Sequence, residues 1–278
     1  TTLFRSHTLP GCFVCRRVSL DPCDACDYDG EAHVKRRSLI IGGASVAAAA
    51  AATHMAQHNG LIPPDWKTPF GLGGALTYAS QRVLLGRGQL AREFKRSDIS
   101  AAFPVNGDPP RSEVYGNLAD GDFKAWRLSI DGLVARPMSY SLADLKAMPV
   151  SGQITLHACE EGWSAIAEWT GVRLATLLNL AGIRDAARYV AFFPFDTNWD
   201  SLDIYEALHP QTLLAYGMNG AELPMEHGAP LRLRVPRQLG YKSVKYLSRI
   251  YVTDSLRGIG SGKGSISPDL GYSWYAGI

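Results

Sequence analysis

The stretch "HGAPLRLRVPRQLGYKSVKYLSR", residues 227–249, decides the fold because it combines strand patterning with a concentration of cations. Arg232 and Arg234 alternate with apolar residues between two prolines, which predicts a strand with one face in the core and the other lining a pocket. Lys242 and Lys245 follow a Gly-Tyr turn. Four cations in so short a span repel one another, so a bound phosphate would relieve the repulsion. Solvated surface charges are the alternative.

A single cysteine stands apart in the stretch "TLHACEEGW", residues 155–163. The chain has five cysteines, and the other four lie within residues 12–26, so Cys159 has no partner in the body of the protein. Strand alternation places His157 and Cys159 on one face of a strand that ends in a Gly-Trp turn. Cys159 is therefore either a buried small hydrophobic residue or an accessible thiolate, and a thiolate there would be a soft metal ligand. His157 is either a neighbour of that site or a support for the turn, and we favour support.

The remaining patterns mix strands and helices without regular alternation, which predicts an α+β fold rather than a Rossmann sheet. Period-two patterning predicts strands at residues 125–134, 153–159, 187–195, 230–236 and 244–254. Helical patterning predicts helices within residues 76–94, 141–149, 171–182 and 205–210, with Ser141 as an N-cap and Gly182 as a C-terminal stop. No glycine-rich dinucleotide motif or Walker pattern is present in the sequence.

The composition is that of a globular protein. At 278 residues with 46% hydrophobic content, the chain has ample material for a core. Its 28 Lys and Arg nearly balance 26 Asp and Glu, so the composition gives no reason to expect nucleic acid as a partner.

The N-terminal part carries the pattern of a twin-arginine export signal over residues 34–58, which predicts a periplasmic protein. Paired arginines at Arg36 and Arg37 precede an apolar run, residues 39–52, that is too short and alanine-rich to span a bilayer comfortably. The alternative is an alanine-rich helix. The Gly- and Pro-rich residues 59–110 are expected to be a lead-in segment that wraps the catalytic domain at residues 111–278.

Residues 1–33 precede this signal, whereas export signals normally lie at the extreme N-terminus. We interpret them as an N-terminal extension that the natural protein lacks. The competing interpretation is a zinc site, because two C-x-x-C pairs can supply four thiolates from Cys12, Cys15, Cys23 and Cys26.

The body of the chain resembles the molybdopterin-dependent oxidoreductases of the sulfite oxidase fold. The resemblance runs from Phe103 to Ile278 and rests on "CEEGW", "WTGVRLATLL", "ALHPQTLLAYGMNGAELPMEHGAPLRLRVP" and "GYKSVKYLSRI". It implies that Cys159 ligates the molybdenum of a molybdenum-molybdopterin cofactor. It also implies that the pterin and its phosphate are held by Asn106, His227, Arg232, Ser243, Val244 and Lys245.

The C-x-E-G-W turn is similar to that of the catalytic subunit of periplasmic protein-methionine-sulfoxide reductases. This resemblance implies two-electron oxygen-atom transfer that reduces an S-oxide or N-oxide. Glu161 near the metal would repel sulfite and could relay protons, and a carboxylate bonded to its own turn is the alternative. Two features depart from the reductase pattern: the Asn-x-x-Tyr-Glu motif of those enzymes is missing, and Pro194 or its neighbours stand where they have a threonine. Trp199 falls near the position of the catalytic tyrosine of sulfite oxidases.

The sequence contains no C-x-x-C-H haem motif, so electrons are expected to come from outside. The resemblance implies a membrane b-type cytochrome or another redox partner. Two other functions stay open: oxidation of sulfite or a related sulfur compound, and a binding module that keeps the fold without a cofactor.

Overall fold

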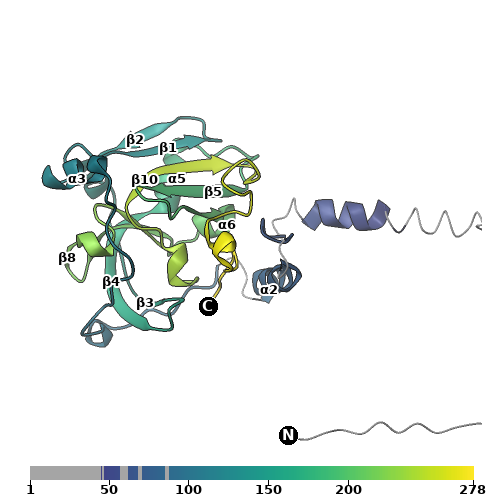
Figure 1. The fold of residues 1–278 in the computed structure, drawn as a ribbon, viewed down its shortest axis with the longest axis horizontal. Helices are drawn as coiled ribbons and strands as arrows, with labels where there is room; N and C mark the ends of the chain where they lie inside the picture. Colours follow the sequence, from purple (N-terminus) through teal and green to yellow (C-terminus); the bar gives the residue numbers. More distant parts are fainter. Residues whose placement is uncertain (1–44, 46, 57–61, 68–70, 85–87) are drawn as a thin grey trace, which may run out of the picture. The chain divides into compact units, whose positions relative to one another are not determined.

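The computed structural model in Figure 1 describes most of the chain, namely residues 45, 47–56, 62–67, 71–84 and 88–278. The predicted extension, the four clustered cysteines and the paired arginines lie outside these residues. The described part of the predicted signal, residues 47–56, is helical, and no described helix is long and apolar enough to cross a membrane. Ala50–Ile278 form one compact unit, so the described lead-in segment and the predicted catalytic domain belong to the same unit.

The first sheet has five strands in the order β2-β1-β10-β5-β6. Its strands are β1 (Leu128–Gly132), β2 (Met138–Tyr140), β5 (Tyr189–Pro194), β6 (Asp200–Asp203) and β10 (Leu247–Thr253). β1 runs parallel to β10, and the other neighbouring pairs are antiparallel. A mixed sheet of this kind agrees with the predicted α+β class.

The second sheet is antiparallel, with the order β3-β4-β7-β8 and with β9 also paired to β7. Its strands are β3 (Ser151–Ala158), β4 (Ser164–Arg173), β7 (Leu213–Met218), β8 (Ala221–Glu222) and β9 (Arg232–Arg234). β3 and β4 form a hairpin in which Ala158 pairs with Ser164. Cys159 therefore lies in the turn of this hairpin, at the end of the predicted strand.

Short helices connect the strands. The α-helices are α2 (Gly71–Leu84), α3 (Glu113–Asp120), α4 (Leu142–Ala147), α5 (Leu174–Ala181) and α6 (Ile204–Ala207). Single 3-10 turns occur at η1 (Arg96–Asp98), η2 (Met225–His227), η3 (Gly240–Lys242) and η4 (Ser267–Leu270). Both predicted helix boundaries are confirmed: Ser141 forms a capping box with Asp144, and Gly182 ends α5 with a φ of 72°.

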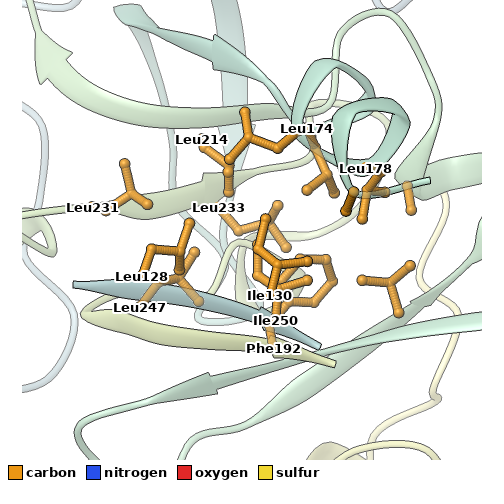
Figure 2. Packing of buried hydrophobic residues seen from close by; sticks show 14 of the residues in the cluster. Leu128, Ile130, Leu174, Leu178, Phe192, Leu214, Leu231, Leu233, Leu247 and Ile250 are labelled. Carbon is orange, nitrogen blue, oxygen red and sulfur yellow. The ribbon is translucent and has the colours of Figure 1, made fainter. Parts of the chain in front are cut away.

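The main core lies between the first sheet, α5 and β9, and Figure 2 shows its side chains. Leu128 and Ile130 from β1 and Leu174 and Leu178 from α5 belong to this one cluster, with Leu214 and Leu233 lying between them. The apolar residues that alternate with the arginines of β9 also belong to this core and are fully buried. Each such side chain stabilises the fold by about 1.5–3 kcal/mol. The apolar face of β9 thus fixes the direction in which its arginines point.

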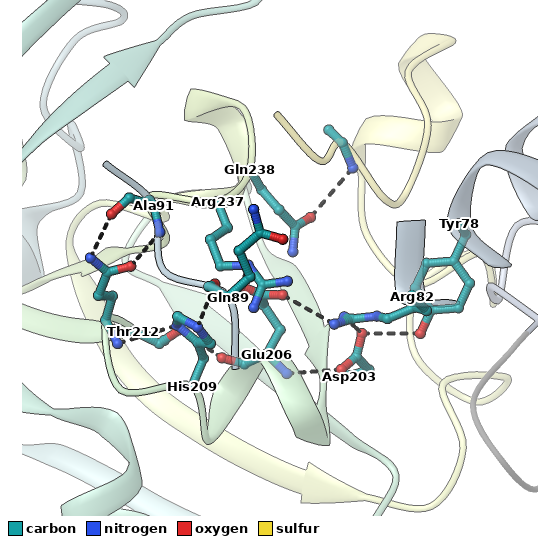
Figure 3. Close-up of polar contacts among 12 residues, drawn as sticks. Tyr78, Arg82, Gln89, Ala91, Asp203, Glu206, His209, Thr212, Arg237 and Gln238 are labelled. Atoms are coloured by element: carbon teal, nitrogen blue, oxygen red, sulfur yellow. Dashed lines mark hydrogen bonds and ion pairs between the residues drawn. The ribbon is translucent and has the colours of Figure 1, made fainter. Parts of the chain in front are cut away.

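Helix α2 of the lead-in segment is held to the body by a buried polar cluster, shown in Figure 3. Arg82 forms ion pairs with Asp203 and Glu206, and all three side chains are at most 7% exposed. Tyr78 donates a hydrogen bond to the same Asp203 carboxylate at 3.0 Å. Arg237 lies on the other side of the cluster, 3.9 Å from Glu206. The predicted lead-in is therefore anchored by paired charges as well as by apolar contacts.

His209, beside this cluster, is expected to make the fold acid-sensitive. Its Nδ1 accepts from the backbone N–H of Gln211, which leaves Nε2 to donate to the carbonyl of Gln89, so the neutral ring is fully bonded. Burial, together with the charge of Arg237, lowers the pKa of His209 to about 4. A depressed folded-state pKa gives stability that is present above the unfolded pKa of about 6.5 and is lost as the pH falls towards 4.

The free energy of unfolding, measured with urea at pH 7 and at pH 4.5, tests this acid sensitivity. The wild type should lose about 2 kcal/mol more over this interval than a His209→Gln variant, because the amide keeps a polar side chain without titrating. Equal losses in the two proteins would show that His209 does not contribute to the acid sensitivity.

Candidate functional site

Cys159 is held in place by the tight turn of the β3–β4 hairpin. Its backbone N–H donates to the carbonyl of Trp163 at 2.9 Å, and its own carbonyl accepts from Gly162 at 3.1 Å. Gly162 has a φ of 90°, in the region that favours glycine. The glycine of the C-x-E-G-W motif is therefore needed to close the turn that presents the sulfur.

A cavity of about 270 Å³ opens beside this turn. It is bounded by six parts of the chain: the lead-in near Asn106, the β3–β4 hairpin around Cys159, the loop that leads into β6, the segment from η2 to β9, the segment from η3 to β10, and the region of η4. Among its lining residues are Phe103, Asn106, His157, Cys159, Glu160, Trp163, Trp199, Asp200, His227, Arg232, Tyr241, Ser243, Val244, Lys245 and Tyr272. All of the residues predicted to hold the cofactor line this one cavity.

The sulfur of Cys159 has polar neighbours. Asn106 Nδ2 lies 3.4 Å from Sγ, and Glu160 Oε2 lies 3.3 Å from it. Glu161 Oε2 is 3.9 Å away and accepts a hydrogen bond from the indole N–H of Trp163 at 2.9 Å. Burial raises the pKa of the Cys159 thiol. The predicted asparagine is thus adjacent to the sulfur, and so is a glutamate that the sequence analysis did not single out.

The two glutamates of the turn differ in position. Glu160 lines the cavity, whereas Glu161 is exposed and is not among the lining residues. The role of Glu161 in proton relay stays a prediction, and its bond to Trp163 matches the alternative of a carboxylate bonded within its own turn. Only the conformation of the turn distinguishes two adjacent identical residues, so the sequence carried no signal for Glu160.

The four cations of the Arg- and Lys-rich stretch do not all face the cavity. Arg232 and Lys245 line it, but Arg234 and Lys242 do not. Arg234 instead donates a hydrogen bond to Thr155 Oγ1 in β3 at 3.3 Å, and Lys242 forms a buried ion pair. The strand alternation placed both arginines on one face correctly, but residues of β3 and β4 also cover this face.

The cations that line the cavity have neutral partners only. Arg232 donates to the carbonyl oxygens of His227 at 2.9 Å and Ser243 at 3.2 Å, and its buried Nε has no hydrogen-bond partner among the described residues. Lys245 donates to two other carbonyl oxygens. Within the described part of the chain, no carboxylate lies within ion-pair distance of either cation.

This arrangement suits an anion. Burial lowers the pKa of Arg232 to about 10, and burial together with the charge of Arg232 lowers the pKa of Lys245 to about 8. A phosphate would favour the charged forms and would give the orphaned Nε of Arg232 an acceptor. The residues present therefore fit a phosphorylated group in the cavity.

Aromatic rings form the rest of the wall around the sulfur. Phe103 contacts the rings of His157, Trp163, Trp169 and His227 at centroid distances of 5.3–5.7 Å. Burial, with the charges of nearby arginines, lowers the pKa of both histidines, so they are neutral at pH 7. Among the described residues, no three His, Cys, Asp or Glu side chains are grouped as metal ligands.

A cavity lined by a cysteine sulfur and by buried cations with neutral partners suits an anionic cofactor that carries a soft metal. Residues 115–257 match the family described as the oxidoreductase molybdopterin binding domain, which is more than half of the chain. The chain belongs to this family and is a molybdopterin-binding oxidoreductase. The predicted family and cofactor are thereby confirmed.

Similar proteins carry sulfoxide reductase names. The chain is 39% identical over 199 residues, 71% of each chain, to the "Putative protein-methionine-sulfoxide reductase subunit YedZ1" of Azospira oryzae. It is 36% identical over 145 residues to the protein-methionine-sulfoxide reductase catalytic subunit MsrP of Ralstonia nicotianae, which covers 46% of this chain and 44% of that protein. A solved structure, the sulfane dehydrogenase SoxCD of Paracoccus pantotrophus, aligns with a TM-score of 0.46 at 27% identity, over 48% of this chain and 39% of that chain.

Proposed function

We propose that this chain reduces an S-oxide, with methionine sulfoxide, free or within a protein, as the substrate class. Two observations support the proposal: the cavity around Cys159 Sγ carries the residues expected of such an enzyme, and similar proteins are named for this activity. The overall reaction consumes two protons and two electrons and converts the S-oxide to a thioether and water.

The chain's own residues would hold the cofactor from three sides. Cys159 would supply a thiolate ligand to molybdenum, with Asn106 donating to its sulfur at 3.4 Å. His227 and Arg232 would contact the pterin, and the segment containing Ser243, Val244 and Lys245 would bind its phosphate. When bound, the cofactor supplies the two-electron exchange of the oxygen atom.

Other residues of the cavity would contact the substrate. Trp163, Trp199 and Tyr272 offer apolar surface for a thioether chain, and Glu160 places a negative charge beside the sulfur. That charge disfavours sulfite and sulfate, which are anions, relative to an uncharged sulfoxide. This contrast favours reduction of a neutral oxide over oxidation of sulfite.

The electrons would come from a separate redox protein, because the sequence contains no haem-attachment motif. We propose a membrane b-type cytochrome as that partner, in a periplasmic setting that fits the twin-arginine pattern at residues 34–58.

The proposal is tested by two assays on the molybdenum-loaded enzyme. With reduced viologen as donor, peptide-bound methionine sulfoxide and dimethyl sulfoxide should be reduced. With ferricyanide as acceptor, sulfite should be oxidised far more slowly. Sulfite oxidation without sulfoxide reduction would contradict the proposal and support the oxidase alternative.

Lys245→Met should weaken cofactor retention. Loss of one charge-assisted hydrogen bond is worth about 1.5–3 kcal/mol, which corresponds to an increase of roughly 10- to 100-fold in the dissociation constant of the cofactor. Molybdenum per folded chain after dialysis is the measurement. Lys146→Met is the control because that lysine is partly exposed and pairs with Glu222 in β8, and neither residue lines the cavity. Equal molybdenum in both variants would show that Lys245 does not bind the phosphate.

A further inference from the structure

The ion pair between Lys242 and Asp200 connects two walls of the cavity. Lys242 is the last residue of η3, and Asp200 is the first residue of β6. The two side chains are only 1% and 3% exposed. Nζ of Lys242 donates to a carboxylate oxygen of Asp200 and, at 2.8 Å, to the carbonyl of Ser201.

The chain on each side of this pair faces the cavity. Tyr241 and Ser243 line it, whereas Lys242 between them does not. On the opposite side, Trp199 and Asp200 both line the cavity. Lys242 therefore lies behind the segment expected to bind the phosphate. Its ammonium group contacts the start of β6, next to Trp199 in the opposite wall of the cavity.

A third segment, the C-terminal tail, closes around the pair. The ring of Trp274 lies 5.0 Å from the Lys242 ammonium, and its indole N–H donates to Ser201 Oγ at 2.8 Å. The backbone N–H of Trp274 donates to Asp65 in the lead-in at 2.8 Å. The ammonium thus has partners in β6 and in the C-terminal tail, and the tail is in turn bonded to the lead-in segment.

Stability alone does not account for a charged pair at this place. Removing both charges from water costs several kcal/mol per ion, and apolar side chains of similar volume would hold two segments together without that cost. Burial raises the pKa of Asp200 to about 6 even though Lys242 acts to lower it, which reflects this desolvation. An ion pair, unlike an apolar contact, fixes the relative position of the two segments, because the ammonium must donate to the carboxylate and to the carbonyl at one place.

We propose that Lys242 and Asp200 are positioning residues, which set the phosphate-facing segment after η3 against the wall that carries Trp199. Ser243 and Lys245 reach the cofactor at the right separation only while the pair is intact. Loss of the pair leaves the protein folded but loosens its hold on the cofactor.

The test removes both charges at once, because a single substitution would leave the other charge buried and unpaired. The double variant Lys242→Met, Asp200→Leu is produced in a host that makes the cofactor. Its melting temperature should stay within a few degrees of the wild type. Molybdenum per folded chain after dialysis should fall about 10-fold or more, which is the size of effect seen when groups supporting a metal site are lost. The Mo(V) paramagnetic resonance spectrum should broaden.

Two further variants keep the test decisive. Asp200→Asn removes the carboxylate charge but keeps the volume and an oxygen that can accept from Lys242 Nζ, so it disturbs folding less than other single substitutions. It should lower molybdenum content by a smaller factor even if the double variant fails to fold. Arg249→Met with Asp131→Leu removes a partly exposed ion pair of the first sheet and should leave molybdenum unchanged. Wild-type molybdenum content and spectrum in the folded Lys242 and Asp200 variants would overturn the proposal, as would a lower melting temperature with unchanged molybdenum per folded chain. These measurements do not depend on which oxide the enzyme reduces.

Discussion

A Cys159→Ser variant is expected to lose S-oxide reduction by at least about 100-fold while keeping its fold. Loss of a group that merely supports a metal ligand already costs about 10- to 100-fold, and Cys159 is the proposed ligand itself. The substitution removes a thiolate donor but leaves the turn intact, because the backbone bonds with Trp163 and Gly162 do not involve the sulfur. The measurement is kcat with reduced viologen and methionine sulfoxide, normalised to molybdenum content.

The matched control for this variant is Ser164→Ala, in the same hairpin. Ser164 is exposed at the start of β4, and it should be replaceable without loss of activity. Both variants should melt at the wild-type temperature. Activity within a factor of about two of the wild type in Cys159→Ser would show that this sulfur does not bind the reacting metal.

An Arg82→Met variant is expected to lower the free energy of unfolding by about 3–5 kcal/mol, because it leaves Asp203 and Glu206 buried without their closest cation. Removing one partner of a buried ion pair costs more than the pair itself contributes. The melting temperature should fall by roughly 10 °C for a domain of this size. Thermal unfolding of the two proteins at pH 7 measures the difference.

Arg249→Met serves as the comparison, because Arg249 pairs with Asp131 at the surface, where both side chains are partly exposed. This variant should lose only about 0–1 kcal/mol. Equal losses in the two variants would mean that helix α2 is not held by its buried charges. Arg82 lies outside the cavity lining, so molybdenum per folded chain should stay at the wild-type value in both variants.

Local patterns in the sequence predicted the helices and strands that have one solvent-exposed face or a clear capping residue. The Ser141 cap, the Gly182 stop and the alternating strand that leads to Cys159 are all found in the structure. β4 and β7 were not predicted. In β4 the buried side of the alternation is carried largely by small residues such as Ala165 and Ala167, which give a weak signal. β7 is buried along most of its length, so its apolar run has no period to detect.

The candidate site was predictable where sequence neighbours act together and unpredictable where distant residues meet. The motif around Cys159 and the segment ending at Lys245 line one cavity, as the family resemblance implied. The burial of Lys242 depends on Asp200, a residue 42 positions away, and no local pattern shows such a partner. Repulsion among the four cations suggested one anion site that all of them share. Two of the four bond to other parts of the protein instead: Arg234 to Thr155 and Lys242 to Asp200.

The molybdenum content of the wild-type protein, purified from a host that makes the cofactor and measured by elemental analysis together with pterin fluorescence, tests the cofactor site most directly. The wild type should contain about one molybdenum per chain, because one cavity holds both the cysteine sulfur and the buried cations expected to bind the cofactor. Folded protein that contains neither molybdenum nor pterin under these conditions would contradict this expectation and would favour a binding module that keeps this fold without the cofactor.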